Sequence, residues 1–108
     1  MKFKVVLTDT GWATLRRCTD YLLNYVGGFG NSQAAISFLS DFTETAARLK
    51  NNAASHPILE NSYFNQLGIR KIHFIRHKYK LLYHIKKQTA FIDYVLHDRQ
   101  DIGLIRLD

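Results

Sequence analysis

Three short segments in the second half of the chain alternate apolar and polar residues, and this alternation constrains the fold more than any other feature. The segments are IRKIHFIR (69–76), YKLLYHIK (79–86) and TAFIDYVLH (89–97). A period of two is typical of β-strands. Only residues 77–78 and 87–88 separate the segments, which is too short for a crossover connection. The sequence therefore predicts three consecutive strands in an antiparallel meander.

The two short connections also predict a strand register. A turn at Lys87-Gln88 leads to the pairs Ile85–Ala90, Tyr83–Ile92, Leu81–Tyr94 and Tyr79–Leu96. A turn at His77-Lys78 leads to the pairs Phe74–Leu81 and Ile72–Tyr83. All these residues are apolar or aromatic and share one face, which a slip of one residue would invert. We expect this face to be buried.

The opposite face of the predicted sheet is expected to stay open, because no further helix remains to cover it. It mixes basic, histidine and scattered apolar side chains: Lys71, His73, Ile75, Lys80, Leu82, His84, Lys86, Phe91, Asp93, Val95 and His97. Lys78 is expected close to His97 at one end of this face.

The first half of the chain predicts one strand and two helices. Residues 1–8 alternate as a strand, and Asp9 or Thr10 can cap the helix that follows. Apolar residues then recur at helical spacing over 12–26 and again over 35–49, with GGFGN (27–31) as the turn between the helices. Residues 51–68, which include Pro57, are predicted to be a loop that can include one short turn. The helical stripes place Trp12, Phe38 and Phe42 in the core, and favour a buried rather than nucleophilic Cys18.

Together these elements predict an α+β domain over residues 1–108 with the order β-α-α-β-β-β. A helical hairpin packs on one face of a small, mainly antiparallel sheet. One cysteine excludes an internal disulfide and favours a reducing compartment. No segment has the length of a transmembrane helix or the pattern of a signal peptide. We therefore expect a cytoplasmic protein with no membrane partner.

Positive charge is concentrated in the predicted meander. Residues 1–68 hold six Lys/Arg and five Asp/Glu, a net of +1, whereas residues 69–108 hold nine and four, a net of +5. Four of the five histidines also lie in the second part. A local basic excess is typical of proteins that bind polyanions, although a solvated basic surface is an equally simple interpretation.

The stretch YVLHDRQD (94–101) places titratable groups where the last predicted strand ends. Cleavage of RNA by its own 2′-hydroxyl needs a base, an acid for the leaving oxygen and cations around the phosphate. Lys71, His73, His97 and Arg99 are the candidates for these catalytic roles. The candidates for RNA or phosphate binding are Arg70, Arg76, Lys78, Lys80 and His84. The alternatives are a basic strand that only binds, and a polar strand end where Asp98 or Asp101 caps backbone amides.

Two other motifs can be considered as a metal site and a phosphate-binding loop, and neither has the sequence context that such a site requires. His73 and His77 have the four-residue spacing of a helical zinc pair, but they fall on a strand and a turn with no third ligand nearby. GGFGN is rich in glycine but follows a helix and lacks the Lys-Ser/Thr of a P-loop. We expect no metal and no cofactor.

The second half of the chain resembles the RelE/ParE superfamily of bacterial toxins. The motifs that carry the resemblance are Arg70–His73, His77–Ile85 and Phe91–Asp101, and the first half has the family's strand-then-helix layout. The resemblance covers about 90 residues by architecture and about 30 by motif. The family's element order is also the β-α-α-β-β-β order that periodicity predicts. The sequence departs from the ribonuclease members in lacking a tyrosine after His97 and a glutamate on the second strand.

The resemblance implies a toxin of a type II toxin–antitoxin system, with an acidic or amphipathic antitoxin as its partner. RelE-like members enter the ribosome and cut mRNA, and matching positions assign that activity to Lys71, His73, Lys78, His97 and Arg99. ParE-like members instead inhibit DNA gyrase and need no hydrolytic site. The histidines and lysines of the open face favour the mRNA endonuclease, and an inactive member that only binds its antitoxin is the third alternative.

Overall fold

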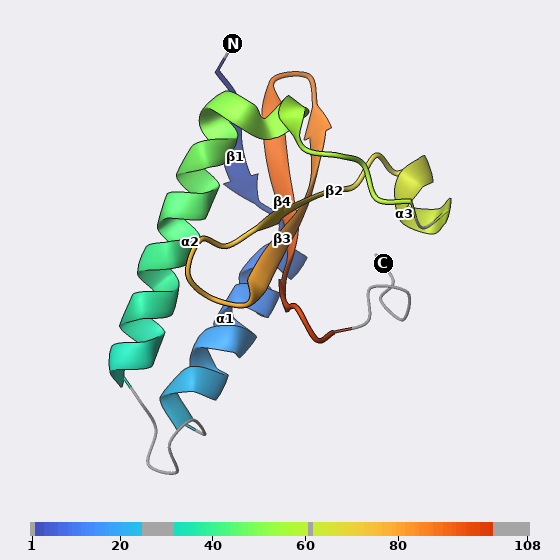
Figure 1. Ribbon diagram of the computed structural model, residues 1–108. Coiled ribbons are helices and arrows are strands. Elements are labelled where there is room, and N and C mark those ends of the chain that lie inside the picture. The colour runs from blue at the N-terminus through green and yellow to red at the C-terminus, as the bar shows by residue number, and fades with distance from the viewer. Residues whose placement is uncertain (1, 25–31, 61, 101–108) are drawn as a thin grey trace.

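The computed structural model of the chain describes residues 2–24, 32–60 and 62–100 and confirms the predicted α+β architecture (Figure 1). The elements are β1 (Lys4–Leu7), α1 (Asp9–Asn24), α2 (Ser32–Asn52), a 3-10 turn η1 (Ala53–Ser55), α3 (Ser62–Gln66), β2 (Arg70–His73), β3 (Tyr79–Lys86) and β4 (Thr89–His97). The predicted turn at 27–31 and Asp101 lie outside the described residues. Within the described residues, no helix combines the length and apolar character needed to cross a membrane.

The four strands form one sheet in the order β1-β4-β3-β2. The β2–β3 and β3–β4 pairs are antiparallel, as predicted, and β1 pairs in parallel with β4. Figure 1 shows α1 and α2 together on one face of this sheet. The main core lies between these two helices and the sheet. It includes Phe38 and Leu49 of α2 with Leu81, Tyr83 and Ile92 of the sheet.

Aromatic rings organise the centre of this core. The Phe38 ring stacks on Phe74, with centroids 5.4 Å apart, and meets the edge of Tyr79 at 4.7 Å. The predicted burial of Phe38 and Phe42 is therefore confirmed. The predicted burial of Trp12 is wrong, because Trp12 is 60% exposed. The inward face of α1 instead carries Gly11, Thr14 and Leu15, which turns the neighbouring Trp12 toward solvent.

Helix α1 takes the place of a strand beside β4. β1 pairs with Thr89–Ile92, and within residues 2–24, 32–60 and 62–100 no strand lies beside the rest of β4 on that side. Thr14 Oγ1 instead accepts a hydrogen bond from the Val95 amide at 2.9 Å, and the Cys18 thiol donates to the Val95 carbonyl at 3.7 Å. Immediately before α1, the amide and hydroxyl of Thr8 both donate to the Ile92 carbonyl, at 3.0 and 3.1 Å. Small polar side chains thus satisfy backbone groups that would otherwise be buried without partners.

The start of α1 also differs from the prediction. Thr8, rather than Asp9 or Thr10, is the N-cap, because its Oγ1 accepts the Gly11 amide at 3.0 Å. Gly11 is required here for its lack of a side chain, since a Cβ at this position would lie 2.3 Å from the Ile92 carbonyl oxygen.

β4 contains a β-bulge that the predicted register lacks. Tyr83 pairs with Ile92, but the adjacent Leu82 pairs with Tyr94, so Asp93 is an extra residue. An extra residue shifts every later position of the strand relative to its partner. The predicted pairs Ile85–Ala90 and Tyr83–Ile92 are confirmed. The predicted pairs Leu81–Tyr94 and Tyr79–Leu96 are wrong, and the observed pairs are Leu81–Val95 and Tyr79–His97.

The β2–β3 register is also shifted, here by two residues. Ile72 pairs with Leu81 rather than Tyr83, because residues 74–78 form a longer connection in which the Phe74 amide donates to the Tyr79 carbonyl at 2.9 Å. A shift of two keeps each side chain on its predicted face. Ile72 and Phe74 therefore remain in the main core.

The face opposite the helices is partly covered, which corrects the prediction that it stays open. The segment predicted as loop contains α3, and Phe64 from α3 is fully buried. Phe64 packs in a second apolar cluster with Ile69, Leu82, Tyr94 and Leu96. Tyr94 and Leu96 reach this cluster because the bulge turned them away from α1 and α2. The uncovered part of the face is thereby reduced to its two ends.

We expect Gly11→Ala to lower the free energy of unfolding by about 1–3 kcal/mol, because the new methyl group meets the Ile92 carbonyl and forces α1 away from β4. In a helix without such crowding, replacing glycine by alanine stabilises the helix by about 1 kcal/mol. Urea unfolding followed by circular dichroism measures the difference. Trp12→Ala, one residue along the helix, is the control and should change stability by less than about 0.5 kcal/mol. A Gly11→Ala variant more stable than the original chain would contradict the close approach.

Candidate functional site

One candidate site lies at the end of the face that α3 leaves uncovered. We define the open-face cluster as Lys71 and His73 of β2, Lys80 of β3 and Asp98 after β4. His73 and Lys80 are cross-strand partners. His73 Nδ1 lies 3.4 Å from Asp98 Oδ1, and Lys80 Nζ donates to the Asp98 carbonyl at 3.3 Å. Asp98 therefore joins the imidazole and the ammonium group into one unit.

Lys80 is an unusual member of this cluster because its side chain is only 5% exposed. Burial lowers the pKa of Lys80, the nearby positive charge of Lys71 lowers it further, and Asp98 opposes both effects. A lysine whose pKa is lowered releases its proton more readily than an exposed one. Such a group can act as an acid as well as a fixed positive charge.

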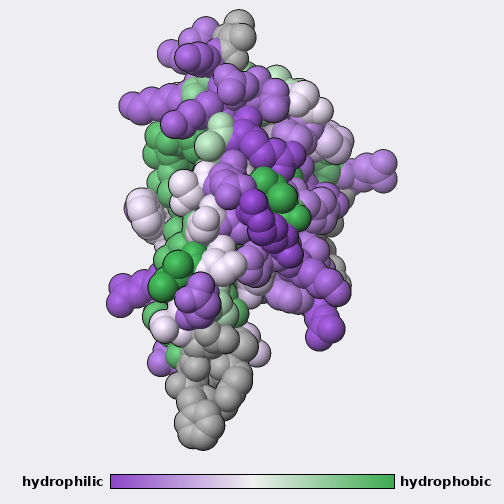
Figure 2. Space-filling view, turned by 60° about the vertical axis from the view of Figure 1, so that its left-hand side comes forward, coloured by the Kyte–Doolittle hydropathy of each residue, from purple (hydrophilic) through white to green (hydrophobic). Residues whose placement is uncertain are grey.

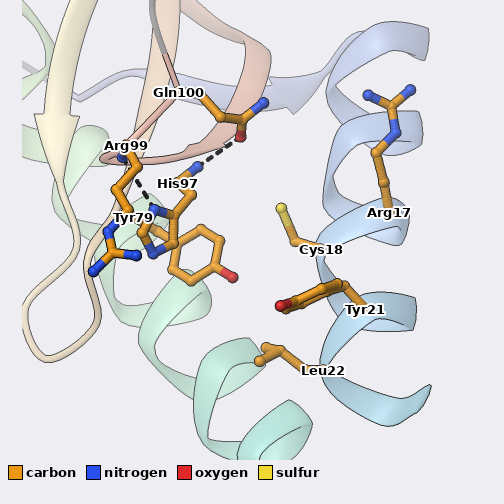
Figure 3. Close-up of a pocket in the computed structure, with 8 residues that line it drawn as sticks. All are labelled: Arg17, Cys18, Tyr21, Leu22, Tyr79, His97, Arg99 and Gln100. Carbon is orange, nitrogen blue, oxygen red and sulfur yellow. Dashed lines mark hydrogen bonds between the residues drawn. The ribbon is translucent and has the colours of Figure 1, made fainter. Parts of the chain in front are cut away.

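His97 and Arg99 belong to a different surface, because the bulge turns His97 toward α1. They line what we call the helix-side pocket, a cavity of about 530 Å³ shown in Figure 3. Its other lining residues are Arg17, Cys18, Tyr21 and Leu22 of α1, Tyr79 of β3, and Gln100. The structure thus separates the four predicted catalytic residues into two pairs: Lys71 with His73 on one face, and His97 with Arg99 on the other.

A compact turn after β4 holds His97 in place. The His97 amide donates to Gln100 Oε1 at 2.9 Å, and the Arg99 amide donates to His97 Nδ1 at 3.0 Å. The second bond makes Nδ1 an acceptor and leaves the ring proton on Nε2. The imidazole also meets the Tyr79 ring edge-on, with centroids 5.0 Å apart. The predicted alternative, in which Asp98 caps this turn, is not what the described residues show, because the capping groups belong to His97 and Gln100.

A second histidine–aspartate pair lies at the other end of the uncovered face. His84 Nδ1 is 2.6 Å from Asp93 Oδ2, and the His84 ring stacks on Phe91 with centroids 5.2 Å apart. Asp93 is the bulge residue, and His84 is the cross-strand partner of Phe91, two residues before it. Burial raises the pKa of the Asp93 carboxyl, which the bond to His84 opposes. This contact anchors the bulge.

Two of the remaining predicted binding residues, Arg70 and Arg76, have partners inside the fold. Arg70 donates to the backbone carbonyls of Ala54 and His56. Arg76 forms an ion pair with Glu44 at 3.0 Å, whereas Lys78 is exposed. These contacts place Arg70 and Arg76 at the margins of the sheet.

Asp41 is a residue that the sequence reasoning missed. Its carboxylate is fully buried and accepts hydrogen bonds from the amides of Ile75, Arg76 and His77 at 2.8–3.0 Å. It also lies 2.8 Å from His77 Nδ1. The signal was present in the sequence, because Asp41 falls between Phe38 and Phe42 on the apolar stripe of α2, where a charge needs buried partners. Asp41 fixes the basic loop at 74–78 and thereby the ends of β2 and β3 that carry His73 and Lys80.

The fold can be compared with those of known proteins. No protein-family model and no curated protein sequence matches the chain. A chain of the chromosomal ParDE TA system from P. aeruginosa is similar in structure, with a TM-score of 0.67 and 14% identity over 89% of this chain and 96% of that one. A chain of the toxin–antitoxin complex RelBE2 from Mycobacterium tuberculosis has a TM-score of 0.55 and 19% identity over 90% of this chain and 99% of that one.

The chain has the RelE/ParE fold. The agreement extends over nearly the whole of each chain, so the resemblance seen in the second half of the sequence is confirmed at the level of the fold. Within this RelE/ParE fold, the open-face cluster and the helix-side pocket lie back to back across the end of β4, and Asp98 stands between His97 and Arg99 in the sequence.

We expect Asp41→Asn to lower the free energy of unfolding by about 2–4 kcal/mol at neutral pH, because an amide cannot replace a carboxylate that accepts several hydrogen bonds. Burial raises the pKa of Asp41, but bonds from His77, Arg76 and Ile75 outweigh it, so the pKa is lowered. The stabilisation is therefore complete above the ordinary aspartate pKa of about 3.9 and is lost as the pH falls through the lower folded value.

Urea unfolding at a series of pH values measures this effect. The difference between Asp41→Asn and the original chain should be largest near neutrality and shrink below a pH of about 4. Glu44→Gln removes an exposed partner of Arg76 and is the control, with an expected change below about 1 kcal/mol. A difference that does not vary with pH would contradict the role of the ionised Asp41.

Proposed function

We propose that this chain is the toxin component of a type II toxin–antitoxin system and that it acts as a RelE-like, ribosome-dependent mRNA endonuclease. The observation that carries the proposal is the open-face cluster. It combines the exposed His73, a carboxylate and two lysines, one half-buried and one buried, at an end of the sheet that α3 leaves uncovered. The fold that the chain shares with the ParDE and RelBE2 chains supports the assignment to this class of toxins.

The cluster contains the parts that cleavage by the 2′-hydroxyl requires. His73 accepts the proton of the attacking hydroxyl, and Asp98, 3.4 Å away, stabilises the imidazolium that forms. Lys71 and Lys80 neutralise the charge that develops on the phosphate. Lys80, with its lowered pKa, also donates a proton to the leaving 5′-oxygen. No step in this scheme calls for a metal ion.

An antitoxin partner suits the chemistry of the surface. The net charge of +6 favours an acidic protein. Three large apolar side chains of the helical hairpin, Trp12, Ile36 and Leu39, are 60%, 60% and 37% exposed. Figure 2 shows hydrophobic patches scattered among hydrophilic surface on one side of the molecule. An acidic, amphipathic helix can use both features.

The decisive experiment adds the purified chain to translating ribosomes and maps breaks in the mRNA. We expect His73→Ala to slow cleavage by about 100-fold or more, because a general acid–base group contributes about that factor. Lys71→Ala should slow cleavage by about tenfold or more, through loss of a charge beside the phosphate. Lys50→Ala removes an exposed lysine of α2 and is the matched control, with no expected effect. Undiminished cleavage by both cluster variants would reject this site.

A ParE-like inhibitor of DNA gyrase is the second candidate, favoured by the higher TM-score of the ParDE chain. Pulse labelling after induced expression separates the two functions, because an mRNA endonuclease stops methionine incorporation first and a gyrase inhibitor stops thymidine incorporation first. Intact mRNA together with blocked supercoiling by purified gyrase would replace the first proposal with the second.

A further inference from the structure

A serine, a histidine and an aspartate form a hydrogen-bonded chain between α2 and the connection from β2 to β3. Ser37 Oγ lies 3.4 Å from His77 Nε2, and His77 Nδ1 lies 2.8 Å from Asp41 Oδ2. Ser37 and Asp41 are four residues apart on α2 and so share one side of the helix, next to the connection at 74–78 (Figure 1). Hydroxyl, imidazole and carboxylate in this order are the parts of an activated serine nucleophile.

The carboxylate determines which ring nitrogen of His77 carries the proton. Burial raises the pKa of Asp41, but the bonds from His77 and from the loop amides outweigh it, so the carboxyl is ionised at neutral pH. A carboxylate only accepts hydrogen bonds, so the proton of the neutral imidazole is on Nδ1. Nε2 is then an acceptor, and the Ser37 hydroxyl donates to it. His77 therefore has the tautomer that a general base for Ser37 requires.

The hydroxyl of Ser37 has a different kind of partner from the threonine hydroxyls of the two long helices. Thr19, Thr43 and Thr45 each donate to the carbonyl four residues earlier, at 2.8–2.9 Å. This arrangement is common for hydroxyl side chains within a helix. Ser37 Oγ instead meets a side chain that lies 40 residues later in the sequence. The fold thus brings this hydroxyl to a base rather than to the backbone of its own helix.

His77 is held in a fixed orientation and is still accessible. Its backbone amide donates to the same oxygen of Asp41 at 2.8 Å, and the Phe38 ring lies perpendicular to the imidazole with centroids 6.4 Å apart. The His77 side chain is 26% exposed, and Ser37 is half-buried. A small substrate can therefore reach both the nucleophile and its base from solvent.

The surroundings of Ser37 restrict the reaction to activated acyl groups. An oxyanion hole needs hydrogen-bond donors that are free to bind the negative charge of the transition state. The loop amides of Ile75, Arg76 and His77 all donate to Asp41, so they do not serve this purpose. The expected acceleration is that of the general base alone, about 100-fold to 10,000-fold. An ester with a good leaving group reacts under these conditions, because its cleavage depends less on an oxyanion hole than that of an amide.

We propose that Ser37 is a nucleophile that takes the acyl group of a small, activated ester, with His77 as its general base and Asp41 as a positioning residue. The Ser37 oxygen forms a bond to the carbonyl carbon of the ester, and its proton passes to His77 Nε2. The bond from that carbon to the leaving oxygen then breaks, and His77 returns the proton to the leaving alcohol. Water, activated by His77 in the same way, later releases the acyl group from Ser37 as a carboxylic acid.

This site is separate from the open-face cluster. Ser37 and Asp41 belong to α2, which lies on the face of the sheet opposite to that of His73 and Lys80 (Figure 1). The inference therefore does not rest on the proposed function, and acylation can be measured without RNA or ribosomes.

The test is the reaction of the 108-residue chain with p-nitrophenyl acetate. We expect a burst of p-nitrophenolate equal to the concentration of the chain, and peptide mass spectrometry should locate the acetyl group on Ser37. Ser37→Ala leaves the Asp41–His77 pair intact and should abolish the burst. His77→Asn keeps an N–H donor for Asp41 but lacks Nε2, and should slow the burst by about 100-fold or more. Ser40→Ala removes an exposed serine of α2 and is the matched control, with an expected change below about twofold.

Three results would overturn the inference. The first is the absence of a burst, or acetylation confined to lysines, which would leave the contact between Ser37 and His77 with an anchoring role alone. The second is a burst that persists in Ser37→Ala. The third is an unchanged burst rate in His77→Asn when its circular dichroism spectrum matches that of the original chain, because a nucleophile that reacts equally well without Nε2 is not activated by this base.

Discussion

The extra residue in β4 decides which groups can act together in this molecule. Without the bulge, strict alternation through a paired Asp93 would place His97 beside Lys71 and His73 and would bury Tyr94 and Leu96 against the helices. Because Asp93 is left unpaired, Val95 and His97 face α1, while Tyr94 and Leu96 pack with Phe64 of α3. The bond from His84 to Asp93 holds the extra residue in position. One histidine–aspartate contact therefore maintains both the second apolar cluster and the separation of the two candidate surfaces.

Two other polar contacts keep the surroundings of the bulge rigid. Thr14 and Cys18 bind the backbone of Val95, immediately after the bulge, and fix α1 to the shifted part of β4. Asp41 fixes the loop between β2 and β3 from the α2 side. Both the open-face cluster and the helix-side pocket therefore rest on side chains that the two long helices send into the sheet. Rigid support of this kind keeps catalytic and binding groups in a productive geometry.

The sequence predicted those features that depend on repeated patterns. Alternation over 69–97 identified the strands, and helical spacing identified the hairpin. Although the β2–β3 register is shifted by two residues, each side chain of these strands lies on the face that was predicted for it. A bulge leaves no repeated pattern in the sequence. Asp93, between Ile92 and Tyr94, fits the alternation of the strand as one more polar residue on the outward face. The position of Trp12 was predicted wrongly because Gly11 and Thr14 form the inward face of α1. Their small size allows α1 to approach the β4 backbone closely, and this approach cannot be predicted from the sequence of α1. Asp98 was considered for capping rather than as the partner of His73, since their pairing depends on contacts between separate strands.

The contact between α1 and β4 has a further consequence for self-association. Beyond Ile92, no strand of the described residues pairs with β4 on one side, and the Val95 backbone is bonded there to the side chains of Thr14 and Cys18. If α1 loosens while the sheet persists, an apolar strand edge becomes accessible to other copies of the chain. Bare edges of this type pair with one another and lead to aggregation. The small polar residues of α1 thus protect this strand edge as well as stabilise the fold, and the partly unfolded chain is expected to be prone to intermolecular β-sheet formation.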